Sequence, residues 1–274
     1  MTLFRIALCQ TAVVHDKFAN LEKARCVVAQ AAAKGAKLAV LPEMFNCPYD
    51  TDRFRAYAEP IPAGMSSRFL SALAAEYRIF LVGGSVPEKS GSRFFNSSPV
   101  FNPKGKLIAL HRKMHLFDVS LKTVKIKESR VLSAGNQVTV FKTPIGPIGL
   151  CLCYDLRFPE LFRLMLKKKV VGVVIPAAFS IETGMAHWHT LLRTRAIDNQ
   201  IFIMAASPAR AKAPDYPAFG HSLAADPFGR ILVEAGEKES LVFFDLDLAV
   251  LKTVRSHLPL LRHRRTDLYD VCAK

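Results

Sequence analysis

Residues 149–160 read Gly-Leu-Cys-Leu-Cys-Tyr-Asp-Leu-Arg-Phe-Pro-Glu, and they join a predicted strand to a predicted helix. The apolar residues 149–153 are typical of a buried strand, and Pro159 suits the first turn of a helix that runs to about Lys168. A sharp turn between the two would expose the side chain of Cys153, as in a nucleophile elbow. A thiolate at this place gains from helix-terminal amides and from a nearby cation. On spacing alone, Cys153 is either a catalytic nucleophile or a buried structural thiol.

Short apolar runs alternate with amphipathic segments along the rest of the chain. Leu21, Ala24, Val28 and Ala31 recur at the spacing of one helical face, and Gly35 can end that helix in a left-handed conformation. Further helices are predicted at 65–77 and 185–199. Strands are predicted at 4–9, 37–41, 79–83, 170–175, 201–206, 222–226 and 241–245, and hairpins at 95–101 with 106–111 and at 138–142 with 149–153.

This alternation predicts an α/β layered core within a single domain that spans residues 1–274. Periodicity alone does not distinguish a parallel, Rossmann-like sheet from a sandwich of two sheets. The last residues, from about 254 to 274, include the basic stretch Arg262-His263-Arg264-Arg265. We expect them to form an irregular, extended tail.

Hydrophobic residues make up 50% of the 274 residues and charged residues 22%, which is close to the globular average and excludes a disordered chain. The longest apolar runs, such as residues 170–179, fall short of the roughly 18 residues that a membrane helix needs. Residues 1–10 are too short and too interrupted for a secretory signal. The six cysteines show no dense disulfide spacing, so a reducing compartment fits best. We therefore expect a soluble cytoplasmic protein, with the mitochondrion as the alternative, and no membrane partner.

The chain is strongly basic. Lys and Arg number 38 against 23 Asp and Glu, which gives a formal net charge of +15. The basic residues are scattered, and no arginine–glycine tract, zinc-finger spacing or aromatic RNA-binding motif accompanies them. We therefore expect no nucleic-acid partner. The charge is interpreted either as a basic solvated surface or as a field that draws small anionic substrates.

Two patterns in the sequence resemble parts of metal sites but are incomplete. Cys151-Leu152-Cys153 has no second cysteine pair and no ordered histidine pair beside it. Because Cys151 lies two residues before Cys153 in a predicted strand, it would share a face with Cys153, and we interpret it as a packing residue. His187 and His189 lie two residues apart in a predicted helix and point to different faces, so they are not expected to share a metal ion.

Two further reactive side chains are predicted at strand ends. Glu43 follows the apolar strand at 37–41 and Pro42. Lys113 lies in the segment His-Arg-Lys-Met-His-Leu-Phe at 111–117, where a predicted hairpin ends. Taken singly, Glu43 is more simply interpreted as a solvated loop carboxylate and Lys113 as a surface lysine.

The three segments, taken in this order, resemble the nitrilase, or carbon–nitrogen hydrolase, superfamily, whose members carry a Glu–Lys–Cys triad. The matching residues are Glu43, Lys113 and Cys153, which are separated by 70 and 40 residues. The resemblance extends from Phe4 to about Tyr269 and is closest to the omega-amidase branch. The segments that resemble this branch are 42–49, 83–88, 115–118, 186–188, 195–200 and 206–210.

This resemblance implies an amidase that hydrolyses the terminal amide of short 2-oxo dicarboxylate monoamides, such as 2-oxoglutaramate and 2-oxosuccinamate, through a cysteine thioester. Cys153 would be the nucleophile, and Glu43 would transfer the proton. Lys113 and the backbone N–H of Tyr154 would stabilise the oxyanion, and Glu128 would orient Lys113. The resemblance implies neither a metal ion nor an organic cofactor.

The resemblance also implies a site for a small anionic amide. Arg157 is placed to receive the substrate carboxylate, and a structural salt bridge to Asp155 or Glu160 is the alternative. By resemblance only, the pocket is expected to include Tyr49, Phe179 and Thr183.

The fold implied by the resemblance is a four-layer α–β–β–α sandwich that forms a homodimer or a higher homo-oligomer. The predicted helices at 159–168 and 185–199 are the candidates for the interface, together with the tail from about 254 to 274. One departure lies at residues 119–127, which replace a Pro-Gly turn near the pocket and leave the substrate open. The alternatives are an amidase acting on deaminated glutathione, another carbon–nitrogen hydrolase, or a non-enzymatic basic binding protein on the same fold.

Overall fold

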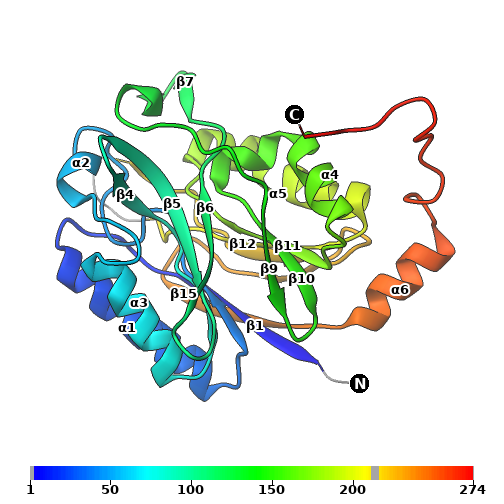
Figure 1. The fold of residues 1–274 in the computed structure, drawn as a ribbon, viewed down its shortest axis with the longest axis horizontal. Helices are drawn as coiled ribbons and strands as arrows, with labels where there is room; N and C mark the ends of the chain where they lie inside the picture. Colours follow the sequence, from blue (N-terminus) through cyan, green and yellow to red (C-terminus); the bar gives the residue numbers. More distant parts are fainter. Residues whose placement is uncertain (1–2, 211–215, 274) are drawn as a thin grey trace.

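Two large β-sheets dominate the computed structural model, which describes residues 3–210 and 216–273 (Figure 1). The strands of the seven-stranded sheet are, in spatial order, β15 (Ser240–Leu246), β1 (Phe4–Gln10), β2 (Leu38–Val40), β3 (Phe80–Val82), β5 (Arg93–Phe101) and β4 (Val86–Ser90), with β6 (Leu107–Arg112) also paired to β5. Those of the six-stranded sheet are β14 (Ile231–Glu234), β13 (Leu223–Ala225), β12 (Phe202–Ala206), β11 (Gly172–Pro176), β10 (Gly146–Leu150) and β9 (Thr139–Thr143). The central strands β1, β2 and β3 run parallel to one another, as do β10, β11 and β12.

Helices cover the outer face of each sheet. The helices are α1 (Lys17–Ala33), α2 (Phe54–Tyr57), α3 (Met65–Glu76), α4 (Pro159–Lys167), α5 (Ile181–Asn199) and α6 (Leu248–His257), with short 3₁₀ helices η1 (Glu128–Arg130) and η2 (Cys153–Arg157). Figure 1 shows α1 and α3 on one side of the molecule, and α4 and α5 on the other. Apolar clusters join α1 and α3 to the seven-stranded sheet, and α4 and α5 to the six-stranded sheet.

A third apolar cluster fills the space between the two sheets. It includes Ile6 and Val40 from one sheet and Ile148, Val174 and Met204 from the other, all fully buried. Burial of each such side chain contributes about 1.5–3 kcal/mol relative to exposure. The layers therefore follow the order helix, sheet, sheet, helix, which confirms the predicted four-layer α–β–β–α sandwich.

Helix boundaries follow from local capping. The predicted stripe of Leu21, Ala24, Val28 and Ala31 is the buried face of α1, and the Asp16 side chain caps this helix by accepting two backbone N–H bonds. The prediction for α5 was wrong at its start, since the helix begins at Ile181 rather than at 185. The Ser180 side chain accepts the backbone N–H of Thr183 and so caps the helix four residues earlier.

The structure corrects two further predictions. The strand predicted at 149–153 ends at Leu150, because the chain leaves the sheet and turns into η2. The predicted irregular tail begins later than 254, because α6 continues to His257. Beyond that residue the described chain contains neither helix nor strand, and Figure 1 shows it passing along the edge of the molecule toward α4.

Residues 119–127, the departure from the family pattern, lie in a two-stranded ribbon of β7 (Asp118–Ser120) and β8 (Lys125–Lys127). The tip of the ribbon is attached to α5, because the backbone N–H and hydroxyl of Thr123 both donate to Glu182. Among the residues that the structure describes, no helix is long and apolar enough to cross a membrane.

Candidate active site

The three side chains of the predicted triad follow the ends of three different strands. Glu43 comes three residues after β2, Lys113 directly after β6, and Cys153 three residues after β10. Gly84 makes the position of Glu43 possible, because a Cβ at residue 84 would lie 2.1 Å from the backbone oxygen of Pro42. Its φ of +58° also belongs to the left-handed region that glycine occupies readily.

The structure brings Glu43, Lys113 and Glu128 together away from solvent. Lys113 Nζ lies 3.0 Å from Glu43 Oε1 and 3.0 Å from Glu128 Oε2, and all three side chains are fully buried. Asn96 Nδ2 donates to Glu43 Oε1 at 2.8 Å, and Tyr49 Oη donates to Glu128 Oε1 at 2.8 Å. The alternatives of a solvated loop carboxylate and a surface lysine are therefore wrong.

Burial and mutual charge set the protonation of this group. Burial raises the pKa of Glu43, and the negative charge of Glu128 raises it further, although Lys113 acts in the opposite direction. Burial alone would lower the pKa of Lys113, but the two carboxylates outweigh it and hold this pKa well above its ordinary value. The two carboxylates therefore favour the ammonium form of Lys113, and the carboxylate of Glu43 has an increased affinity for a proton.

Cys153 occupies the turn between β10 and α4 and is also buried. Its φ is +40°, which is uncommon for a non-glycine residue, and the backbone N–H of Ala178 lies 3.5 Å from its Sγ. Burial raises the pKa of the thiol well above its ordinary value; Glu43 raises it further, while Lys113 lowers it. The side chain is therefore a neutral thiol at neutral pH. It lies beside a carboxylate whose second oxygen, Glu43 Oε2, has no hydrogen-bond partner in the described residues.

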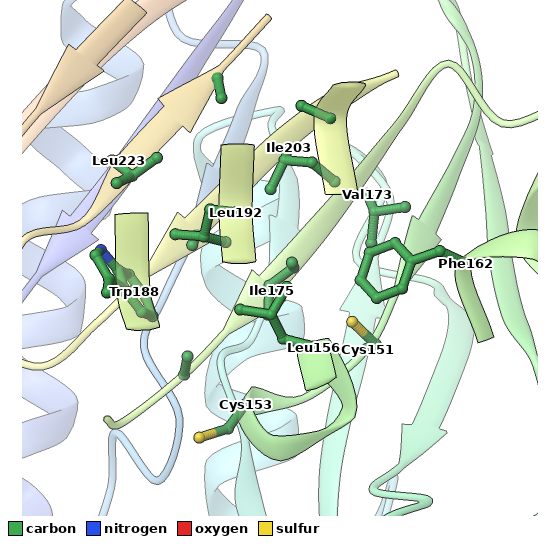
Figure 2. Close-up of a cluster of buried hydrophobic side chains, with 14 of the residues drawn as sticks. Cys151, Cys153, Leu156, Phe162, Val173, Ile175, Trp188, Leu192, Ile203 and Leu223 are labelled. Atoms are coloured by element: carbon green, nitrogen blue, oxygen red, sulfur yellow. The ribbon is translucent and has the colours of Figure 1, made fainter. Parts of the chain in front are cut away.

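The predicted relation between Cys151 and Cys153 was wrong, because the chain turns between them. Figure 2 shows Cys151 near Phe162, whereas the sulfur of Cys153, which belongs to the same apolar cluster, is directed away from Cys151. Cys151 is fully buried, which agrees with its interpretation as a packing residue.

Asp155 connects the turn that carries Cys153 to the segment that carries Lys113. Its carboxylate accepts from Leu152 N at 3.0 Å and contacts His111 Nε2 at 2.9 Å and His115 Nδ1 at 2.7 Å. Burial alone would raise the pKa of Asp155, but the hydrogen bonds from both histidines outweigh it and hold this pKa well below its usual range. His111, His115 and Asp155 all belong to the predicted motifs, but this connection between the two motifs was not predicted.

A cavity of about 290 Å³ opens beside this group of residues. Glu43, Tyr49, Ala178 and Tyr216 are among its lining residues, and most of the others are apolar. Tyr216 stacks on Tyr49 with a centroid distance of 4.7 Å, and its hydroxyl donates to the backbone oxygen of Ala178 at 2.7 Å. Sequence reasoning missed Tyr216, because this residue lies outside the motifs, six residues after the segment 206–210.

The other predicted binding residues, Arg157, Phe179 and Thr183, are not among the residues that line the cavity. Thr183 is buried and takes part in the cap of α5, where its backbone N–H donates to Ser180. Phe179 is buried and packs on Trp188 with a ring-centroid distance of 5.0 Å. The ring of Tyr154 packs on that of Phe117 with a centroid distance of 5.1 Å.

Arg157 makes no ion pair with Asp155 or Glu160 among the described residues. Its guanidinium instead lies 4.9 Å from the ring centre of Phe179, and its Nη1 contacts His187 Nδ1 at 3.3 Å. The salt-bridge alternative for Arg157 is therefore wrong, and its role toward a substrate stays a prediction.

A four-layer sandwich with a buried carboxylate, lysine and cysteine beside a small cavity is the arrangement expected of an enzyme of the nitrilase superfamily. A family model described as carbon-nitrogen hydrolase matches residues 5–256. The chain belongs to this family and is a carbon–nitrogen hydrolase.

Known relatives cover nearly the whole chain. Omega-amidase NIT2 of Danio rerio is 45% identical over 272 residues, which are 99% of this chain and 98% of that protein. Omega-amidase NIT2 of Homo sapiens is 43% identical with the same coverage. Among solved structures, Nit3 of Saccharomyces cerevisiae, a member of branch 10 of the nitrilase superfamily, superposes with a TM-score of 0.89 at 42% identity and covers 96% of this chain and 97% of its own.

Proposed function

We propose that this carbon–nitrogen hydrolase is an omega-amidase, which hydrolyses the terminal amide of 2-oxoglutaramate and 2-oxosuccinamate to the acid and ammonia. The observation that carries the proposal is the buried arrangement of Glu43, Lys113, Glu128 and Cys153 beside one cavity. The similarity to omega-amidases along the whole chain supports the substrate class.

The size of the cavity favours a short substrate. A volume of about 290 Å³ is at the lower end of ligand pockets, and it suits a molecule of about ten non-hydrogen atoms such as 2-oxoglutaramate. Deaminated glutathione has about twice as many atoms, so it would have to extend out of this cavity.

The proposed acylation begins with a neutral thiol. The sulfur of Cys153 bonds to the amide carbonyl carbon while its proton passes to Glu43, whose Oε2 is free to accept it. Lys113 and the backbone N–H of Tyr154 stabilise the negative oxygen that develops. The C–N bond then breaks, the proton on Glu43 passes to the leaving nitrogen, and ammonia departs from the thioester.

Deacylation uses the same groups. Glu43 takes a proton from a water molecule, and the hydroxyl oxygen bonds to the thioester carbonyl carbon. The C–S bond breaks, the proton returns from Glu43 to the sulfur, and the acid is released. Two carboxylates around Lys113 hold its ammonium in place through both steps, since each lies 3.0 Å from Nζ.

The proposed partner is a small anionic amide, and Arg157 is the proposed contact for its carboxylate. Arg157 lies at the end of η2, four residues after Cys153, and its charge has no acidic partner among the described residues. A guanidinium can bind a carboxylate in a bidentate manner.

The test is ammonia release from both 2-oxo acid amides, with glutamine and deaminated glutathione beside them. We expect activity on the oxo-acid amides and its loss in Cys153→Ala, with an unchanged circular-dichroism spectrum. Cys26→Ala is the matched control, because Cys26 is exposed on α1. An active Cys153→Ala protein would refute the mechanism. Activity on deaminated glutathione alone would refute the substrate class.

We propose in addition that the chain forms a homodimer through the outer face of α4 and α5. Met185 on α5 is 74% exposed, and Ile197 on the same helix is 37% exposed. Apolar side chains at such exposure are stabilised when a second surface covers them. Sedimentation should give twice the 30.4 kDa mass of the chain, and Met185→Glu should shift it toward the monomer. A wild-type protein that sediments as a monomer would refute the dimer.

A further inference from the structure

A second group of convergent side chains lies outside the catalytic cavity, between α5 and the edge of the six-stranded sheet. His189 Nε2 and His221 Nδ1 each lie 2.8 Å from Glu234 Oε1, and one ligand atom from each residue lies within 4.8 Å of the others. In the parts of the chain that the structure describes, this is the one group of three histidine, cysteine or acidic side chains with such spacing. None of the three lines the catalytic cavity.

Three separate segments of the chain position these side chains. His189 belongs to α5, His221 lies two residues before β13, and Glu234 ends β14. The β13–β14 pairing places Leu223 opposite Glu234, and Trp188 Nε1 of α5 donates to the backbone oxygen of His221 at 2.7 Å. The backbone at all three positions is therefore fixed independently of the side-chain contacts.

The two imidazole rings are also oriented by packing. The ring of Phe219 stacks on the ring of His221 with a centroid distance of 4.3 Å. It also contacts the ring of His189 edge-on, with a centroid distance of 6.2 Å. All three side chains are partly exposed, with side-chain exposures of 38%, 24% and 30% for His189, His221 and Glu234. An ion from solvent can therefore reach the group without unfolding of the chain.

We propose that His189, His221 and Glu234 form a binding site for Zn²⁺, with water completing the coordination. Two imidazole nitrogens and one carboxylate oxygen are ligands that zinc accepts, and they leave one tetrahedral position open. Tetrahedral zinc at about 2.1 Å from each atom requires the ligand atoms to lie about 3.4 Å apart. The two 2.8 Å contacts need to open by about 0.6 Å, and the two imidazole nitrogens, which lie within 4.8 Å of each other, need to come to the same spacing of about 3.4 Å. All three side chains are partly exposed, so rotations of the side chains can make these changes.

A bound ion would connect α5 to the β13–β14 edge. Ala178 lies three residues before α5 and contacts Cys153 Sγ through its backbone N–H, so an ion bound to α5 would also stabilise the chain segment beside the active site. Because its ligands take no part in the proposed amide hydrolysis, we expect the ion to stabilise the fold rather than to react with substrate.

The proposal is tested by calorimetric titration of Zn²⁺ into the Cys153→Ala protein, a background that removes the catalytic thiol as a competing ligand. We expect one ion per chain, and a binding constant weakened at least about tenfold in His189→Gln and in Glu234→Gln. The matched control is His263→Gln, because His263 is exposed and outside the group. The melting temperature should rise with Zn²⁺ in the background and control proteins, and not in the two ligand variants.

Cobalt gives a second readout, because Co²⁺ bound to thiolates has intense near-ultraviolet charge-transfer bands that nitrogen and oxygen ligands lack. We expect visible bands of a nitrogen–oxygen site without the thiolate bands. Equal affinity in the background, His189→Gln and Glu234→Gln proteins would overturn the proposal, as would absence of binding or thiolate bands from the bound Co²⁺. If His189→Gln fails to fold, the nearly isosteric Glu234→Gln decides the question.

Discussion

Replacement of Glu128 by Gln tests whether the buried charges set the pKa of Glu43, the proposed catalytic base. Glu43 and Glu128 each lie 3.0 Å from the same Lys113 Nζ, so the two carboxylates are at most about 6 Å apart. At this distance and an effective dielectric constant of about 20, two like charges repel by about 3 kcal/mol, or about 2 pKa units. Because Glu128 raises the pKa of Glu43, Glu128→Gln should lower that pKa.

The sign of the effect on activity follows from the role of Glu43. In the proposed mechanism the ionised carboxylate accepts the thiol proton, so kcat/KM is lost as the pH falls through the pKa of Glu43 in the free enzyme. With the charge of Glu128 removed, activity should persist to a pH lower by about 1–2 units. The maximal value of kcat/KM, reached above the pKa of Glu43, should fall about 10- to 100-fold, because Lys113 loses one of the two carboxylates that position it.

The assay is the pH profile of kcat/KM for 2-oxoglutaramate, from pH 4 to pH 8, with ammonia as the product measured. Glu160→Gln is the matched control, since Glu160 is exposed on α4 and should leave both plateau and acid limb unchanged. If the loss of kcat/KM at low pH occurs at the same pH or at a higher pH in Glu128→Gln than in wild type, the electrostatic coupling is refuted, even if the maximal kcat/KM falls.

Three further variants test other contacts of the site. Asp155→Asn should destabilise the fold by about 3–5 kcal/mol in urea unfolding at pH 7, because a buried carboxylate that contacts His111 and His115 is lost. The pKa of Asp155 is depressed in the folded state, so its stabilising effect is complete above its ordinary pKa of about 3.9 and is lost as the pH falls below that value. The difference in the free energy of unfolding between wild type and Asp155→Asn should therefore become smaller at low pH. A difference that does not change with pH would contradict this account. Tyr216→Phe removes the hydrogen bond to Ala178 but keeps the stacking on Tyr49, so kcat should fall about fivefold with KM unchanged, whereas the exposed Tyr269→Phe should change neither. Arg157→Ala should raise KM for 2-oxoglutaramate about 10- to 100-fold and leave a neutral short amide unaffected; equal losses on both substrates would exclude Arg157 as the carboxylate contact.

The layers of the fold were predictable because their cause is local. Apolar residues at helical or strand spacing, such as Leu21, Ala24 and Val28, mark the face that must be buried, and α1 buries that face. The errors occurred where a tertiary contact decides the boundary. Cys153 lies outside its predicted strand because the Asp155 carboxylate accepts the backbone N–H of Leu152 and the chain turns there. The spacing of apolar residues in the sequence does not indicate that hydrogen bond.

The candidate site could be predicted only as far as its motifs extend. Glu43, Lys113, Glu128 and Cys153 were named because each belongs to a recognisable segment. Tyr216 and Asn96 were missed because their roles depend on packing between distant parts of the chain: Asn96 donates to Glu43 across 53 positions. The chemical types of an amide and a phenol are also too common to suggest a role on their own.

The protonation of the site follows from the same burial that makes the fold stable. Lys113 balances one carboxylate, so the buried group of Glu43, Lys113 and Glu128 would carry one net negative charge with both carboxylates ionised, and a thiolate beside it would add a second. The pKa of Cys153 is raised for this reason as well as by burial, and the sulfur keeps its proton while the site is empty. The thiol loses its proton only as negative charge develops on the substrate carbonyl oxygen, which Lys113 would stabilise. In the proposed mechanism, nucleophilic attack and proton transfer to Glu43 are therefore coupled, so the thiol would become reactive toward an electrophile bound in the cavity rather than toward solvent.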